Sequence, residues 1–225
     1  MFYYNHKMRK WDILILDRSA SMLTNMDKLK KGFNNLIQEQ KEAQLNSRLT
    51  VIGFNNVVEV IKDEYFPNVL PLEDEHYYAL GMTALLDAVG NAYDLIIANK
   101  EYDDITLTVI TDGEENCSKY YDFKTLDEKK KQINNRNVKF VFMGADSNCI
   151  ENNIIRPHVS QSLNYRGDIV QAMRTASQSM SRGNSTNADS SQEYTESKPM
   201  IKRDGSILQN DPPSIKKCKR LCSTS

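Results

Sequence analysis

The chain has 225 residues, of which 29 are Lys or Arg and 30 are Asp or Glu, so its formal net charge is −1. A chain of this length has room for one α/β domain of about 150–200 residues and a tail. The balanced charge gives no reason to expect nucleic acid or an acidic membrane as a partner.

The sequence shows neither a secretion signal nor a membrane span. Residues 1–10 carry charges and tyrosines in place of an apolar stretch, and no run reaches the ~18 apolar residues of a membrane helix. The four cysteines are spaced too irregularly for a disulfide framework or a zinc site. We therefore expect a cytoplasmic, intracellular protein in which residues 1–10 are an extension before the domain.

The first predicted strand leads directly into a group of oxygen-bearing side chains. The unbroken aliphatic run 13–16 is typical of a strand buried on both faces of a parallel sheet. Asp17, Ser19 and Ser21 follow at the carboxyl end, where such sheets bind ligands. Hard divalent cations such as Mg²⁺ prefer oxygen ligands. Asp and Ser also cap helices, so this short stretch alone leaves both interpretations open.

A helix and a hairpin are predicted next. Apolar residues recur at helical spacing over 26–37. Two β-branched runs follow, 49–54 and 57–61, and they are separated by Asn55 and Asn56, a pair that tolerates positive φ in a two-residue turn. We therefore expect the second run to be an antiparallel edge strand.

An irregular connection leads from the hairpin to the second helix. Residues 63–82 contain Pro67, Pro71 and several acids, which favours a surface loop. The apolar spacing over 85–97 then predicts a long amphipathic helix, with Thr83 as its cap or first-turn residue.

A second carboxylate ends the next predicted strand. Residues 105–111 are predicted to be the next buried strand, and Asp112 follows them directly, so it also stands at a carboxyl end. Asp17 and Asp112 are therefore expected to face one crevice. Glu114 and Glu115 are predicted to be solvated loop residues.

The rest of the chain completes an alternating order of strands and helices. The remaining patterns predict one strand and three helices, at 138–144 and at 122–135, 148–155 and 167–180. This order is typical of a doubly wound, mostly parallel α/β sheet of six strands, with one antiparallel edge strand and helices on both faces. We assign residues 11–182 to this domain. Residues 183–225 are polar with a basic end, and we expect a disordered tail because they carry little apolar surface to bury.

Three separated segments together resemble the von Willebrand factor A (vWA) family. They are residues 15–21 (ILDRSAS), 81–85 (GMTAL) and 109–113 (VITDG), in this order. In that family the three segments build the metal-ion-dependent adhesion site, and no position of it is missing here. The resemblance implies that Mg²⁺ or Mn²⁺ is held by Asp17, Ser19, Ser21, Thr83 and Asp112.

The resemblance also implies how such a site works. In the family, the serines bind the cation directly, the aspartates bind directly or through water, and the threonine joins in the ligand-bound form. A carboxylate from a partner protein fills the last position, so the implied function is a non-enzymatic, metal-dependent protein-binding module. Residues 140–146 (FVFMGAD) further resemble single-domain intracellular and phage members of the family, and frequent Asn, Lys and Ile fit a bacterial or viral origin.

Two other functions stay open at this stage. A phosphatase or phosphotransferase of the haloacid dehalogenase type also binds Mg²⁺ beside an Asp at the end of its first strand, but Ser19 replaces the second carboxylate that this chemistry needs. A metal-free scaffold domain is the second alternative. The phosphate-binding motif G-x-x-x-x-G-K-[ST] does not occur, which argues against an NTPase.

Overall fold

The computed structural model describes residues 9–43, 47–145, 155–166 and 168–182. Six strands form one sheet in the order β3-β2-β1-β4-β5-β6, in which the β2–β3 pair is antiparallel and the other pairs are parallel. The bounds are β1 Lys10–Asp17, β2 Arg48–Phe54, β3 Val58–Tyr65, β4 Asp104–Thr111, β5 Asn137–Gly144 and β6 Gln161–Asn164. The predicted doubly wound sheet with one antiparallel edge strand is confirmed.

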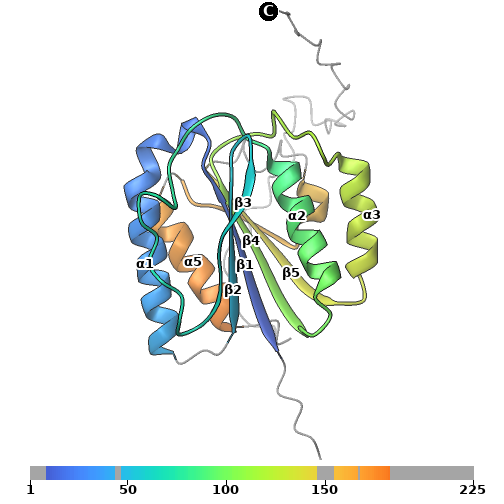
Figure 1. The fold of residues 1–225 in the computed structure, drawn as a ribbon, viewed down its shortest axis with the longest axis horizontal. Helices are drawn as coiled ribbons and strands as arrows, with labels where there is room; N and C mark the ends of the chain where they lie inside the picture. Colours follow the sequence, from blue (N-terminus) through green and yellow to red (C-terminus); the bar gives the residue numbers. More distant parts are fainter. Residues whose placement is uncertain (1–8, 44–46, 146–154, 167, 183–225) are drawn as a thin grey trace, which may run out of the picture. The chain divides into compact units, whose positions relative to one another are not determined.

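Helices flank the sheet on both sides (Figure 1). One side carries α1 Met26–Glu42 and α5 Ile169–Arg182, and the other carries α2 Leu85–Ala98 and α3 Phe123–Ile133. Two 3-10 helices, η1 Ala20–Asn25 and η2 Arg156–His158, lie in connections. Within the described ranges, no helix is both long and apolar enough to cross a membrane. The tail expected at 183–225, residues 1–8 of the predicted extension, and nearly all of the helix expected at 148–155 lie outside the described residues.

The central strand β1 is buried on both faces, as its unbroken aliphatic run predicts. Ile13 and Ile15 belong to the core beneath α2 and α3, whereas Leu14 and Leu16 belong to the core beneath α1 and α5. All four side chains are fully buried. Because each such burial contributes about 1.5–3 kcal/mol, the centre of the sheet is a firm support for the loops at its carboxyl edge.

The predicted β2–β3 hairpin is present, but its turn differs from the expected one. Residues 55–57 connect the strands, which makes the turn three residues long, and neither Asn55 nor Asn56 has a positive φ. The Asn55 side chain instead accepts a hydrogen bond from the backbone N of Val57, with Oδ1 at 3.0 Å. The backbone N of Asn55 also donates to the carbonyl of Val57 at 3.1 Å, so one side-chain and one backbone hydrogen bond close the turn without a positive φ.

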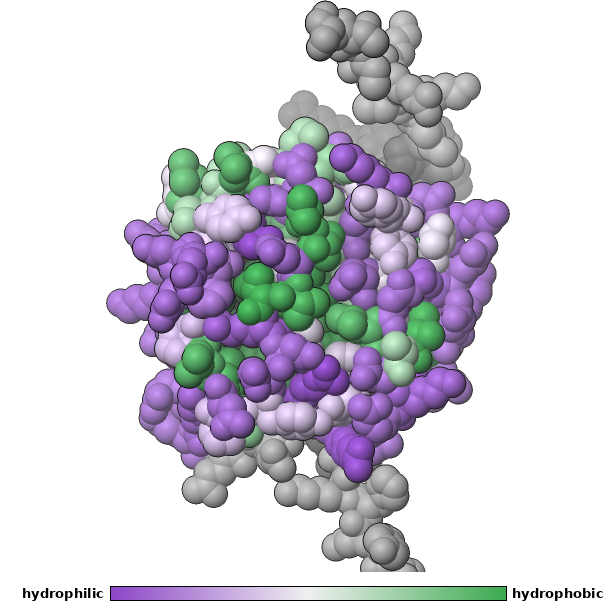
Figure 2. Space-filling model, viewed as in Figure 1, coloured by the Kyte–Doolittle hydropathy of each residue, from purple (hydrophilic) through white to green (hydrophobic). Residues whose placement is uncertain are grey.

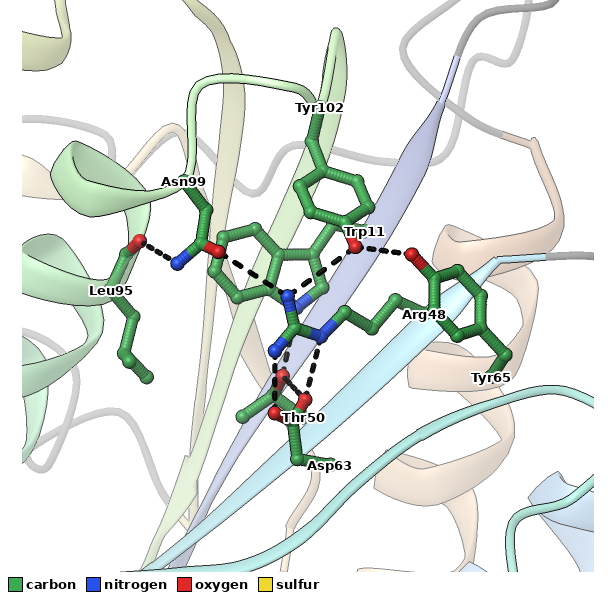
Figure 3. Close-up of polar contacts among 8 residues, drawn as sticks. All are labelled: Trp11, Arg48, Thr50, Asp63, Tyr65, Leu95, Asn99 and Tyr102. Carbon is green, nitrogen blue, oxygen red and sulfur yellow. Dashed lines mark hydrogen bonds and ion pairs between the residues drawn. The ribbon is translucent and has the colours of Figure 1, made fainter.

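A polar and aromatic cluster ties the hairpin to the centre of the sheet at the opposite, amino-terminal edge (Figure 3). Arg48 on β2 donates from Nε to Oδ1 of Asp63 on β3 at 2.7 Å. The guanidinium carbon also lies 4.9 Å from the ring centre of Trp11 and 5.6 Å from that of Tyr102. Arg48 therefore joins β1, β2, β3 and the segment between α2 and β4.

Candidate metal centre

The structure brings the five predicted metal ligands together at the carboxyl edge of the sheet. Asp17 ends β1, and Asp112 directly follows β4, its neighbour in the sheet. Ser19 and Ser21 lie in the loop and 3-10 helix after β1, and Thr83 lies two residues before α2. Asp17, Ser19 and Thr83 are buried, whereas Asp112 is half-buried and Ser21 is exposed. The group therefore extends from the protein interior to solvent.

Hydrogen bonds connect four of these residues in a chain. The backbone N of Ser19 donates to Oδ1 of Asp17 at 2.7 Å, and the hydroxyls of Ser19 and Ser21 share a hydrogen bond of 2.9 Å. Ser21 Oγ then donates to Oδ1 of Asp112 at 2.5 Å. Each hydroxyl oxygen has two lone pairs, so both serines keep acceptor capacity that a cation can use.

Thr83 lies beside the same volume as Asp17 and Ser21, as the surroundings of Gly113 show. A Cβ atom added to Gly113 would lie 3.1 Å from Oγ1 of Thr83 and 3.7 Å from both Oδ2 of Asp17 and Oγ of Ser21. Three oxygen atoms, from the end of β1, the β1–α1 connection and the segment before α2, thus surround one small volume that the missing side chain of Gly113 leaves open. This small, oxygen-only donor set fits Mg²⁺ or Mn²⁺, hard ions that also keep water ligands.

Both aspartates have raised pKa values. Burial raises the pKa of Asp17 to about 6, although hydrogen bonds from Thr111 and Ser19 act in the opposite direction. Burial also raises the pKa of Asp112, against the hydrogen bond from Ser21. A buried site disfavours the ionised carboxylate, and a cation beside the two side chains would favour it.

Thr111 and Tyr77 hold Asp17 in place, and the sequence alone did not identify either residue. Thr111 donates from its hydroxyl to Oδ2 of Asp17, and the same hydroxyl accepts a hydrogen bond of 3.1 Å from the backbone N of Gly113. The Tyr77 hydroxyl donates to the backbone carbonyl of Asp17. Such contacts orient the groups that bind a metal. The sequence did hold a signal for Thr111, because it is a polar residue directly before Asp112. It held none for Tyr77, which is one of several polar and aromatic residues in the irregular connection 63–82.

Two predictions about helix α2 and its surroundings are wrong. Thr83 does not cap the helix, because the cap position is Ala84. The backbone N of Leu86 in the first turn instead donates to Oε2 of Glu115 at 2.8 Å. Glu115 is therefore a half-buried structural residue and not a solvated one, while Glu114 is exposed as expected. Glu115 thus serves the start of the helix, and the Thr83 hydroxyl lies beside the oxygens of Asp17 and Ser21.

The sequence matches no protein-family model and no curated protein. Among solved structures, the PilB minor pilin from Streptococcus sanguinis matches with a TM-score of 0.57 and 13% identity over 76% of this chain and 61% of that chain. The ArnB paralog VWA2 from Sulfolobus acidocaldarius matches with a TM-score of 0.53 and 14% identity over 76% of this chain and 44% of that chain. The fold is vWA-like.

A third structure extends the range of proteins that share this vWA-like fold. The pilus adhesin SpaC from Lactobacillus rhamnosus GG matches with a TM-score of 0.58 and 12% identity, over 79% of this chain and 31% of that chain. The chain thus spans less than two thirds of each of these three proteins. At such low identity the likeness concerns the fold, and function has to be argued from the site.

Proposed function

We propose that this vWA-like domain is a non-enzymatic module that binds a partner protein through a Mg²⁺ or Mn²⁺ ion. The observation that carries the proposal is the convergence of hydroxyl and carboxylate oxygens around the open volume beside Gly113. In this proposal the ion is held by Asp17, Ser19, Ser21, Thr83 and Asp112.

The charge of the donor set favours an external anion as the remaining ligand. Two carboxylates, Asp17 and Asp112, face a divalent ion together with three neutral hydroxyls. Neutral hydroxyls donate little charge, so the ion keeps a strong attraction for one further carboxylate. The exposed position of Ser21 gives a partner protein access to this side of the centre.

The donor set supports binding over phosphoryl chemistry. Ser19 stands where a haloacid dehalogenase has its acid–base carboxylate, and its hydroxyl is bonded to Ser21. A serine hydroxyl does not exchange protons efficiently at neutral pH. We therefore place the metal in recognition of an acidic residue on a protein partner, with neither nucleic acid nor a membrane involved.

The proposal is tested by separating metal binding from partner binding. Asp17→Ala is expected to abolish Mg²⁺ binding in a calorimetric titration. Thr83→Ala is expected to spare much of it and still weaken metal-dependent capture of partners from lysate, because the threonine joins chiefly in the partner-bound form. Asp27→Ala, an exposed aspartate in the first turn of α1, is the matched control and is expected to change neither.

Three results would count against this function. Equal loss of Mg²⁺ affinity in the Asp17 and Thr83 variants would contradict the division of roles. Partner capture that ignores EDTA would favour the scaffold alternative. Hydrolysis of phosphate esters that depends on Asp17 would favour the haloacid dehalogenase alternative.

A further inference from the structure

Exposed hydrophobic side chains gather beside the candidate metal centre. Leu23 in η1, Val57 in the hairpin turn, and Leu80 and Met82 before α2 are 64%, 62%, 66% and 50% exposed. Single exposed apolar residues are ordinary, but a group of them on neighbouring loops is typical of a binding surface. We call these four residues the apolar rim.

Backbone contacts hold the loops of the apolar rim together. The backbone N of Met82 donates to Oδ1 of Asn56 at 2.9 Å, directly beside Val57 in the hairpin turn. The backbone N of Ala20 donates to the carbonyl of Gly81 at 3.0 Å, which joins the start of η1 to the same segment. In the view of Figure 2, hydrophobic side chains reach the surface at the upper left, the end of the molecule where η1 lies in Figure 1.

The loop that follows β4 carries acidic residues and borders the candidate metal centre. Asp112, Glu114 and Glu115 follow β4, and the backbone N of Asn116 in this loop donates to the carbonyl of Thr83 at 3.0 Å. Glu114 is exposed, and its side chain has no hydrogen bond or ion pair with any residue that the structure describes. The hairpin turn meets this acidic loop directly, since Asn56 Nδ2 donates to Sγ of Cys117 at 3.9 Å. The apolar rim and Glu114 therefore lie on neighbouring segments around the candidate metal centre.

We propose that the partner presents a mixed segment, in which apolar side chains beside the metal-binding acidic residue pack on the apolar rim and a basic side chain pairs with Glu114. This inference rests on the proposed function and specifies the chemistry of the partner. A purely acidic segment would be repelled by Glu114 and would leave the apolar rim in water. An acidic residue with apolar and basic neighbours complements both the apolar rim and Glu114, and such complementarity gives specificity.

The inference is tested with four synthetic peptides in Mg²⁺. The reference peptide has a central Asp, Leu and Ile on one side, and Lys on the other. The variants replace Asp by Asn, the two apolar residues by Ser, or Lys by Glu. We expect the reference peptide to bind in Mg²⁺ and not in EDTA. Replacing Asp or the two apolar residues is expected to weaken binding about tenfold or more. Replacing Lys by Glu is expected to weaken binding only about two- to fivefold, because Glu114 is exposed.

Protein variants then locate the effect. The double variant Leu80→Ser, Met82→Ser is expected to weaken the reference peptide about tenfold and to leave the Ser-containing peptide unchanged, since that peptide has no apolar contact to lose. Leu70→Ser, which changes an equally exposed leucine outside the apolar rim, is the matched control and is expected to have no effect. Glu114→Gln is expected to remove the preference for Lys over Glu.

The outcomes separate this inference from the function on which it rests. Mg²⁺-dependent binding that is the same for all flanking residues overturns the inference and leaves the proposed function standing. Binding that persists in EDTA overturns the proposed function. If no peptide binds at millimolar concentration while Mg²⁺ itself binds in the calorimeter, the mixed segment is not the recognised chemistry.

Discussion

The affinity for Mg²⁺ is expected to fall steeply below pH 6. Burial raises the pKa of Asp17 to about 6, and a metal binds the ionised carboxylate. About 99% of Asp17 is ionised at pH 8, and about one molecule in eleven at pH 5. The apparent association constant is therefore expected to be about tenfold lower at pH 5 than at pH 8, which corresponds to about 1.4 kcal/mol. The raised pKa of Asp112 acts in the same direction.

Calorimetric titration with MgCl₂ at the two pH values measures this change. Repeating the titration in buffers of different ionisation enthalpy counts the protons released, and we expect about one proton per ion at pH 5 and none at pH 8. Asp12→Asn is the matched control, because Asp12 on the same strand is also buried with a pKa raised to about 6 and does not belong to the centre. This variant is expected to keep the wild-type pH profile. Equal affinity at pH 5 and pH 8 would refute the assignment of Asp17 as a metal ligand.

Three further predictions concern stability. Asp12→Asn is expected to raise the free energy of unfolding by up to about 3 kcal/mol at pH 7.5 and to have little effect at pH 4. The reason is that the raised pKa of Asp12 in the folded state destabilises the protein only as pH rises from about 4 through 6. Thermal melts at pH 7.5 and pH 4 check this prediction, and an equal gain in stability at the two pH values would contradict it. Arg48→Met is expected to lower the free energy of unfolding in urea by about 2 kcal/mol, because it removes the ion pair with Asp63 and the contacts with the Trp11 and Tyr102 rings. Arg48→Lys should recover only part of this loss, and an unchanged urea midpoint would show that the cluster contributes nothing. Ending the chain after Arg182 is expected to move Tm by less than about 2 °C, because residues 183–225 show no apolar periodicity, and a larger drop would mean that the tail stabilises the domain.

The fold class and four of the five candidate ligand positions were predictable because their signals are local. The aliphatic run of β1 and the largely β-branched run of β4 indicate buried strands, and each run is followed at once by an aspartate. Parallel strands align their carboxyl ends, so Asp17 and Asp112 were expected at the same edge of the sheet. The pairing of β1 with β4 brings them together. Thr83 was found only through the family resemblance, since its position before α2 first indicated a cap.

Features that depend on distant contacts were not predictable from the sequence. The edge strand β6 has the polar sequence QSLN, which lacks an apolar pattern, and its pairing with β5 defines it. Tyr77 reaches Asp17 across 60 residues from a segment without periodicity. Glu115 serves the first turn of α2 from 29 residues further along the chain, whereas helix-capping rules consider only neighbours in sequence.

The dual use of the loop after β4 has a consequence for protein engineering. This loop places Asp112 in the candidate metal centre, holds the first turn of α2 through Glu115, and bonds to Thr83 through Asn116. Grafting the ligand residues alone onto another scaffold would therefore leave the helix start without its acceptor and Thr83 without its support. The transferable unit is residues 17–21 together with segments 81–86 and 111–118, and a recipient scaffold has to accommodate all three.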